Sequence, residues 1–477
     1  MKKRYSIVVP EELYHEVRNH LLEDPAEEAA AFLLAGVHFS DRGVRLLARR
    51  TVKIPRDLYR KKLEYHLDIA PKAINGLASL CEVNNLTAII CHSHPRSLSS
   101  LAYSPSDDYG EARISRFLQD NTGNNPVGSL LFSETGIKGR IWQNGKSVPV
   151  DSISTIGEVI HILADASGQR DRAISQRHSR QVALLGEEGQ RRLSSLRVGI
   201  VGVGGTGSCV AEQLARLGVA SVLLIDDDYL EESNVTRMYG TYPDQFKKRI
   251  FRKHRKDDLS KVKVITQHLV RINPDLKVEP IHGNVVVRDV ARKLLSCDVI
   301  LLCTDEHWGR SIVNQISYQY YIPVVNMGVR VDAPNEVISA AAGDVHTLGP
   351  GKPCLWCYEF LKADRIAAES MLPEQRTERL REGYVQGLGP APMVISLTST
   401  VASLAVTELI HLVTGFREER SIKHLKWNIM DGQVWSGGLQ ASDKCLCKKV
   451  LGYGDLKALP THDDPDFVRR CRGQRKL

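Results

Sequence analysis

Long apolar segments are scarce in this sequence, and we expect neither a secretory signal nor a membrane span. The basic start, Met1-Lys2-Lys3-Arg4, precedes an apolar run at 6–10 that is too short for a signal peptide. The longest apolar stretch, 391–415, carries Glu408 and His411, which favours a buried helix over a membrane span. We therefore expect a cytoplasmic protein without a membrane association.

A disulfide framework is also absent. Ten cysteines in 477 residues do not suggest one, and four of them form two close pairs instead. These pairs are Cys354-x-x-Cys357 and Cys445-x-Cys447. In a reducing compartment such pairs indicate metal ligands before anything else, and the alternative is two unrelated thiol pairs.

The formal net charge is +8, and much of the excess lies in the basic segment 247–256. No alternation of basic and aromatic side chains suited to base stacking occurs there, which argues against nucleic acid as a partner. A solvated surface and a docking surface for an acidic protein both remain open for this segment.

Length and composition indicate a globular protein of two or three domains. The chain is 42% hydrophobic and 25% charged, and 477 residues exceed one ordinary core. Residues 1–150 alternate helix and strand signals, and we expect a first α/β domain there. Its expected elements are helices at 11–22 and 27–31 and strands at 32–36, 86–91 and within 127–142.

A polar stretch, 151–172, is expected to act as a linker, with a short helix at 156–164. A second domain, 173–447, shows the strand–helix alternation of a doubly wound, Rossmann-like α/β sheet. We expect strands at 196–201, 221–226, 298–303 and 322–326 and a helix at 208–217. The charged tail, 448–477, is expected to be loosely ordered.

The motif Cys91-His92-Ser93-His94-Pro95, followed by Ser104-Pro105-Ser106-Asp107, indicates a metal site in the first domain. Two histidines and one aspartate with an open position for water are the ligands of a catalytic zinc ion. Such an ion lowers the pKa of bound water and polarises a carbonyl group. A carboxylate base is still needed, and Glu28 or Glu27 is the candidate. Ser104 is expected to donate a hydrogen bond to the tetrahedral oxyanion.

This pattern, Glu … His-x-His-Pro … Ser-x-x-Asp, resembles the JAMM (JAB/MPN) metallo-isopeptidase family over residues 5–145. The resemblance implies a JAB/MPN-like α/β fold, zinc bound by His92, His94 and Asp107, and Glu28 as the base in preference to Glu27. The alternative is a degenerate domain kept as a scaffold or as a binder of a ubiquitin fold.

The second domain carries a glycine loop, Gly202-Val203-Gly204-Gly205-Thr206-Gly207, directly after an expected strand. Glycines let the backbone approach a phosphate, and the following helix N-terminus favours negative charge. The loop alone also fits a nicotinamide-dependent dehydrogenase, and Asp226 would serve a ribose hydroxyl in either case.

Further motifs flank this loop in a fixed order. They are Arg177-His178-Ser179-Arg180-Gln181-Val182, Asp226-Asp227-Asp228, Ser233-Asn234-Val235-Thr236-Arg237, Lys261-Val262, Arg271-Ile272-Asn273-Pro274 and Cys303-Thr304-Asp305. Over 173–447 this series resembles the adenylating enzymes that activate ubiquitin-like proteins, including the ThiF and MoeB type activators of the thiamin and molybdopterin sulfur carriers.

The resemblance implies ATP, Mg2+ and structural Zn2+ as cofactors, and a role for each matching residue. The phosphate loop is formed by Gly202, Gly204, Gly205 and Gly207, and the nucleotide is further bound by Asp226 (ribose), Asp228, Asn234, Arg237 and Lys261. Asp305 would coordinate Mg2+, and Arg180 would act as an arginine finger across a homodimer interface. Cys354, Cys357, Cys445 and Cys447 would share the structural zinc ion. The bland alternative for Arg180 and Arg237 is a role in surface ion pairs.

One absence bears on the product. Thioester-forming relatives place a nucleophilic cysteine after the first zinc pair, and 358–391 contains none. The acyl-adenylate would then be handed on, or the thiol would come from another protein.

The two resemblances together favour a bifunctional enzyme that cleaves after the C-terminal glycine of a ubiquitin-like β-grasp protein and adenylates the exposed carboxylate. A bacterial conjugation or defence pathway with a conjugating enzyme is expected. A competing hypothesis is sulfur-carrier activation with a sulfurtransferase, for cofactor or amino-acid biosynthesis. A binding module with one silent half and a tRNA-modifying adenylating enzyme are also compatible with the sequence.

Overall fold

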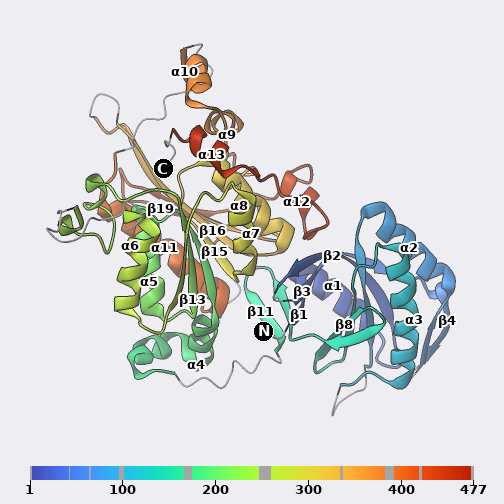
Figure 1. Cartoon of the computed structure of the whole chain (residues 1–477). Helices are drawn as coiled ribbons and strands as arrows, with labels where there is room; N and C mark the ends of the chain where they lie inside the picture. The colour runs from blue at the N-terminus through green and yellow to red at the C-terminus, as the bar shows by residue number, and fades with distance from the viewer. Residues whose placement is uncertain are drawn as a thin grey trace. The chain divides into compact units, whose positions relative to one another are not determined.

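The structure, a computed structural model, describes residues 3–41, 43–63, 66–95, 101–165, 174–246, 259–333, 337–381, 392–417 and 422–473 (Figure 1). They form two compact units. Unit 1 comprises Met1–Gln169 with two short pieces, Gln319–Tyr321 and Val450–Ala458, and unit 2 comprises the remainder. The basic segment 247–256 lies outside the described residues.

Unit 1 is built on a nine-stranded sheet with the order β11-β10-β1-β3-β2-β6-β7-β8-β9. Its strands are β1 (Arg4–Pro10), β2 (Ala30–Ser40), β3 (Gly43–Lys53), β6 (Thr87–Ser93), β7 (Val127–Phe132), β8 (Ile137–Gln143), β9 (Lys146–Pro149), β10 (Ser152–Ile156) and β11 (Ile160–Asp165). The helices are α1 (Glu11–Leu21), α2 (Pro71–Asn84) and α3 (Pro105–Asn121), with a small hairpin of β4 (Tyr59–Leu63) and β5 (His66–Ile69).

The central strand β2 is buried on both faces, and its alternating side chains enter two separate cores. Ala31 and Leu33 belong to the core that contains Val17 and Leu21 of α1. Phe32 and its neighbours on the opposite face belong to the core formed with α2 and α3. A near-continuous apolar run at 30–37 is the sequence signature of a strand covered on both sides.

Two expectations for unit 1 were wrong. The segment 27–31 is not a helix: the Glu28 N–H donates to the Leu63 carbonyl and the Ala29 N–H to Ser93 Oγ, and β2 begins at Ala30. The polar stretch 151–172 is not a linker over its described part, because β10 and β11 extend the sheet there. Ile153 of β10 is fully buried, and β11 replaces the helix expected at 156–164.

Unit 2 contains an eight-stranded sheet with the order β14-β13-β12-β15-β16-β17-β18-β19. Its strands are β12 (Arg197–Val201), β13 (Ser221–Asp226), β14 (Lys277–His282), β15 (Val299–Leu302), β16 (Val324–Asp332), β17 (Ala340–Leu348), β18 (His424–Asn428) and β19 (Val434–Gly437). The first five strands in this order, β14, β13, β12, β15 and β16, pair in parallel. Strands β17, β18 and β19 follow and pair antiparallel. The expected doubly wound α/β sheet is confirmed, with its four expected strands in β12, β13, β15 and β16.

The helices of unit 2 are α4 (Ser179–Ser195), α5 (Gly205–Leu217), α6 (Lys261–Ile272), α7 (Arg288–Lys293), α8 (His307–Tyr320), α9 (Ala363–Glu369), α10 (Pro373–Arg381), α11 (Ile395–Thr414), α12 (Leu446–Val450) and α13 (Pro465–Cys471). Among the described residues, α11 is the helix long and apolar enough to cross a membrane, and 50% of its apolar stretch is buried inside the structure. It packs against α5 and β16, as expected for a core helix.

The loosely ordered tail expected at 448–477 was wrong for its described part. Helix α13 buries Val468 and Cys471, which lie three residues apart on one helical face. The Asp464 carboxylate accepts the N–H of Asp466 and caps the helix, and Arg376 Nη2 donates to the Cys471 carbonyl at 2.7 Å. A seven-residue helix in a charged segment gives too weak a periodic signal to be read from sequence.

Candidate functional sites

In unit 1, strand β6 and helix α3 bring together the side chains expected to bind zinc. His92 lies in β6, and the N–H of His94, just beyond the strand, donates to the Phe132 carbonyl. Asp107 lies in the first turn of α3, where it forms a capping box with Ser104. The Ser104 N–H donates to Asp107 Oδ2 at 2.6 Å, and the Asp107 N–H donates to Ser104 Oγ at 3.2 Å. The Ser-x-x-Asp spacing therefore fixes the aspartate through a helix cap.

The three side chains meet with the geometry of a metal site. Asp107 Oδ1 lies 3.4 Å from His92 Nε2, and Asp107 Oδ2 lies 3.4 Å from His94 Nε2. One ligand atom from each residue lies within 4.8 Å of the others. His92 Nε2 is buried and has no hydrogen-bond partner among the described residues, although a buried polar atom normally has one. A metal ion would satisfy it, so these residues fit zinc.

Glu28, and not Glu27, faces this cluster. Glu28 is 6% exposed, and its Oε1 lies 3.4 Å from His94 Nε2. Burial raises the pKa of Glu28 to about 7, against the opposite influence of His94 and His92. A carboxylate with such a pKa is suited to general-base work near neutral pH. Glu27 instead lies 3.3 Å from Lys62 Nζ.

Glu111, which was not predicted from the sequence, faces the other nitrogen of His92. Glu111 Oε1 lies 3.6 Å from His92 Nδ1. Its carboxylate is buried and accepts from Arg140 Nε at 2.8 Å, Trp142 Nε1 at 3.0 Å and Ser129 Oγ at 2.6 Å. A carboxylate in this place orients a ligating imidazole. The spacing of four residues from Asp107 on α3 was the available signal.

In unit 2, the glycine loop joins β12 to α5, and two of its glycines are required by close backbone approaches. Gly202 has φ +87°, and a Cβ there would lie 2.7 Å from the Thr304 nitrogen. A Cβ on Gly207 would lie 1.9 Å from the Gly202 carbonyl oxygen. By contrast, a Cβ on Gly204 would meet no described atom within 4 Å. The loop therefore packs closely against neighbouring backbone at Gly202 and Gly207. It is open at Gly204, beside the N-terminus of α5.

Asp226 ends strand β13 and shapes this loop. Its Oδ2 accepts the Val203 N–H at 2.6 Å, and its Oδ1 accepts the Asp228 N–H at 2.9 Å. Asp228 Oδ2 in turn accepts from Lys261 Nζ at 2.7 Å. Burial works to lower the pKa of Lys261, but the carboxylates of Asp226 and Asp228 outweigh it and raise that pKa. These carboxylates therefore hold Lys261 beside the loop in its charged form.

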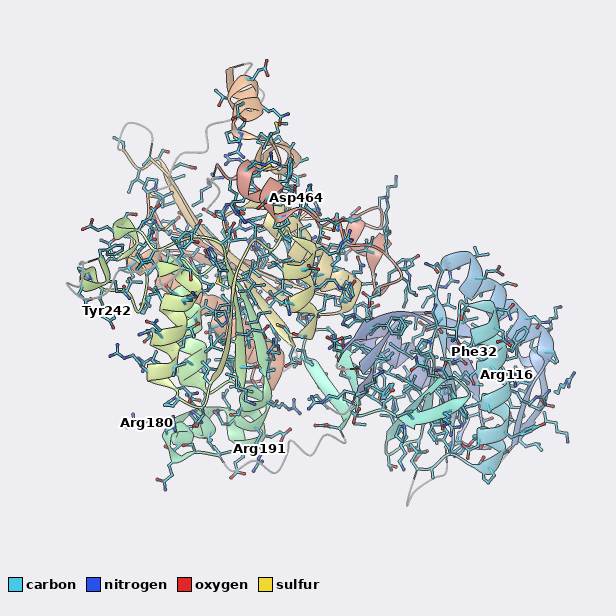
Figure 2. The ribbon with its side chains drawn as sticks, viewed as in Figure 1. Phe32, Arg116, Arg180, Arg191, Tyr242 and Asp464 are labelled. Atoms are coloured by element: carbon cyan, nitrogen blue, oxygen red, sulfur yellow. The ribbon has the colours of Figure 1, made fainter. Side chains whose placement is uncertain are left out.

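The other expected nucleotide residues take different positions around the loop. Asn234 is buried in a short 3-10 helix, where its Oδ1 accepts the Glu231 N–H. The Arg237 side chain donates to the Ser233 carbonyl, and the Arg237 carbonyl oxygen would lie 3.3 Å from a Cβ on Gly205. Asp305 is exposed just beyond β15, and Arg180 is exposed near the start of α4 (Figure 2).

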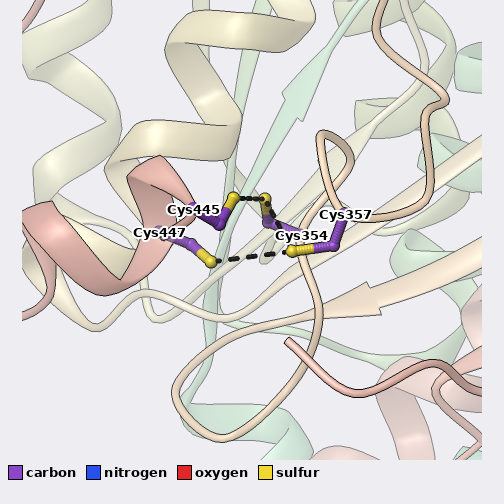
Figure 3. A group of neighbouring side chains, drawn as sticks. All are labelled: Cys354, Cys357, Cys445 and Cys447. Carbon is purple, nitrogen blue, oxygen red and sulfur yellow. Dashed lines mark hydrogen bonds between the residues drawn. The ribbon is translucent and has the colours of Figure 1, made fainter. Parts of the chain in front are cut away.

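The four expected zinc cysteines converge at one point (Figure 3). Cys354 Sγ lies 3.4 Å from Cys445 Sγ and 3.7 Å from Cys357 Sγ, and Cys357 Sγ lies 3.9 Å from Cys447 Sγ. Tetrahedral zinc with Zn–S bonds of about 2.3 Å separates its sulfurs by roughly 3.8 Å. The four thiols are free of disulfides and fit one zinc ion.

Comparison with known proteins identifies the family of unit 2. The sequence model of the ThiF family matches residues 178–448. The chain therefore belongs to the ThiF family. These residues form a ThiF-type adenylyltransferase domain, the ThiF domain, which covers the glycine loop, Lys261, Asp305 and the cysteine cluster.

Several ThiF relatives are similar in sequence. The SAMP-activating enzyme E1 of Haloferax volcanii is 26% identical over 299 residues, which cover 62% of this chain and 94% of that protein. The molybdopterin-synthase adenylyltransferase of Escherichia coli is 25% identical over 271 residues, which cover 56% of this chain and 94% of that protein. The ubiquitin-like modifier-activating enzyme 5 of Drosophila virilis is 29% identical, and the match spans 48% of this chain and 52% of that protein. Among solved structures, E. coli MccB with succinimide matches with TM-score 0.44 and 20% identity over 59% of this chain and 75% of that one.

The surroundings of Gly207 and Gly204 in the ThiF domain predict different effects of an alanine substitution on stability. Gly207→Ala places a methyl group 1.9 Å from a backbone oxygen, so the loop or α5 must shift. We expect it to lower the free energy of unfolding by about 1–3 kcal/mol, measured by urea denaturation. Gly204→Ala is the matched control and should change stability by less than about 0.5 kcal/mol. Equal effects of both variants would contradict the close approach.

Proposed function

We propose that this chain activates and processes the C-terminus of a ubiquitin-like β-grasp protein. The ThiF domain adenylates the C-terminal carboxylate with Mg-ATP, and unit 1 cleaves the peptide or isopeptide bond after the terminal glycine. The observation that carries the proposal is the ThiF match over the glycine loop and its flanking cations. The His92, His94 and Asp107 cluster with buried Glu28 extends it to cleavage.

In the adenylation step, a carboxylate oxygen of the partner attacks the α-phosphorus of ATP, the bond to the bridging oxygen breaks, and pyrophosphate leaves. The N-terminus of α5 and the loop N–H groups hold phosphate oxygens. Lys261 and Arg237 lie beside the loop and offset the charge that develops on them. Mg2+, held by Asp305, would neutralise further phosphate charge. Arg180, exposed on α4, would reach the site of a second subunit as an arginine finger.

The names of the relatives support the substrate class. One is a SAMP-activating enzyme, one a ubiquitin-like modifier-activating enzyme, and one a molybdopterin-synthase adenylyltransferase. The word modifier in the second name favours protein conjugation. That this conjugation belongs to a bacterial conjugation or defence pathway is our proposal and goes beyond those names. The third keeps sulfur-carrier activation as the second candidate. Activation in either pathway begins with the same adenylate.

The cysteines support transfer of the adenylate without a thioester on this chain. Outside the four-cysteine cluster, five of the six cysteines are buried, and Cys303 is half-buried. Burial raises the pKa of Cys297 to about 12 and also raises that of Cys303. A thiol held in its neutral form is a poor nucleophile. The acyl group would pass directly to a conjugating enzyme or sulfurtransferase.

In the cleavage step, water attacks the carbonyl carbon, Glu28 takes the proton and delivers it to the leaving nitrogen, and the C–N bond breaks. Zinc held by His92, His94 and Asp107 would lower the pKa of a bound water and polarise the carbonyl. Glu111 fixes His92, and the helix cap at Ser104 fixes Asp107. Ser104 Oγ, 2.7 Å from Ser106 Oγ, remains the proposed donor to the oxyanion.

The adenylation proposal is tested with Mg-ATP and a β-grasp protein that ends in two glycines. We expect ATP–pyrophosphate exchange and an adenylated partner detected by intact mass. Asp305→Asn should reduce exchange at least about a hundredfold, because the carboxylate ligand for Mg2+ is lost. It should leave cleavage by unit 1 intact, which controls for folding. Full exchange by Asp305→Asn would contradict the role of Asp305.

The two adjacent glutamates provide a matched test of cleavage. Glu28→Gln should abolish release of a C-terminal extension from the β-grasp precursor, because the amide takes no proton from water. Glu27→Gln should retain cleavage within about threefold, because Glu27 pairs with Lys62. Both variants should keep ATP–pyrophosphate exchange. Cleavage by Glu28→Gln would sink its role as the base.

Metal analysis of the purified full-length protein tests both zinc sites. We expect two zinc ions per chain, one at each proposed cluster. His94→Ala should remove one of them and Cys357→Ser the other, each leaving the second in place. Exposed His15→Ala and buried Cys81→Ala, which lie outside the clusters, should keep both ions. A zinc content unchanged by His94→Ala would contradict the site in unit 1.

A further inference from the structure

The C-terminal helix α13 ends beside the acidic residues that follow β13 and β15 in unit 2. Arg472, the residue after the helix, contacts three carboxylates from the two segments. Its Nη1 pairs with Asp227, its Nη2 lies 3.3 Å from Asp228 Oδ1, and its Nε lies 2.8 Å from Glu306 Oε1. No role was predicted for Arg472 from the sequence, because it lies in the charged tail.

These carboxylates form a crowded group that needs a cation. Asn284 donates to Asp227 Oδ2 at 3.2 Å and to Glu306 Oε2 at 3.3 Å, which fixes both acids. Carboxylates held this close repel one another, and they would also repel the phosphates of ATP.

Arg472 is connected to the phosphate site through Asp228. One oxygen of Asp228 faces Arg472, and the other accepts from Lys261 Nζ at 2.7 Å. Asp228 thus lies between two cations, one from the C-terminal helix and one from α6. Loss of Arg472 would leave Lys261 as the nearby cation for a larger acidic group and draw it away from phosphate.

Asp305, the residue proposed to hold Mg2+, follows β15 at the exposed surface, and the three ion pairs of Arg472 go to other carboxylates. The arginine therefore neutralises acids that have no assigned metal and leaves the proposed ligand to Mg2+. Without it, Asp227, Asp228 and Glu306 would offer Mg2+ a competing set of carboxylates.

We propose that Arg472 is a positioning residue of the adenylation site: from the C-terminal helix, it neutralises Asp227, Asp228 and Glu306 and thereby keeps Lys261 available to the phosphates of ATP. This role rests on the proposed adenylation. It acts on binding of Mg-ATP before chemistry, so its loss affects KM for ATP more than kcat.

The experiment compares Arg472→Gln and Arg472→Lys with the wild type in the full-length protein, by ATP–pyrophosphate exchange over a range of ATP and Mg2+. We expect Arg472→Gln to raise KM for ATP about tenfold with kcat within about twofold, and to require more Mg2+. Arg472→Lys keeps the charge and should recover KM to within about threefold of the wild type. Arg470→Gln, exposed on the same helix, is the matched control and should behave as the wild type.

A double variant separates electrostatics from helix docking. In a Glu306→Gln background, one of the repelling charges is gone, so adding Arg472→Gln should raise KM by only about threefold. A purely structural role for Arg472 would give the same change in both backgrounds, and that result would overturn the proposal.

Two further results would also overturn it. One is an unchanged KM for ATP in Arg472→Gln. The other is a lower Mg2+ requirement with faster exchange in that variant, which would mean that Arg472 inhibits the adenylation site. Wild-type exchange measures the proposed adenylation itself. Absence of exchange in the wild type would refute that function, whereas equality of wild type and Arg472→Gln would refute only the role of Arg472.

Discussion

The ThiF domain depends on one constraint: five parallel strands end at the same edge of the sheet, and acidic residues follow two of them. Asp226, Asp227 and Asp228 lie at the end of β13 and directly after it, and Asp305 and Glu306 follow β15. Their mutual repulsion is offset by loop N–H groups, by Lys261 and by Arg472. The same crowding makes this edge suited to a bound cation and to a phosphate held by neighbouring cations.

Unit 1 also brings several carboxylates close together, here around two histidines. Glu28, Asp107 and Glu111 approach two imidazoles in a largely buried setting, each within 3.6 Å of a histidine nitrogen. Arg140 compensates the buried Glu111, while Glu28 faces a histidine and has a raised pKa. Glu111 thus lies against an arginine and Glu28 against a histidine, so the two buried carboxylates differ in their charged partners.

Local signals explain which features were predictable. The expected strands and the glycine loop were identified because hydrophobic runs and a dense glycine motif report on a few adjacent residues. The helix expected at 27–31 was wrong, and so was the linker expected at 151–172 over its described part, because neither segment has a strong pattern of its own. Pairing with β6 and with β1 decided their conformation. Glu111 and Arg472 were missed because their partners are distant in the chain.

The sequence by itself determined the ligand types, the order of the ThiF motifs and the two cysteine pairs. Each of these can be read from residue types and from short spacings within a motif. The tertiary structure places Glu28 and not Glu27 at the histidines and brings together four cysteines separated by about ninety residues, as the resemblances implied. Only the tertiary structure decided that Arg472 reaches the acids after β13 and β15. The physical reason is that side-chain direction and long-range contact depend on how sheets and helices pack, which no local pattern of residue types encodes.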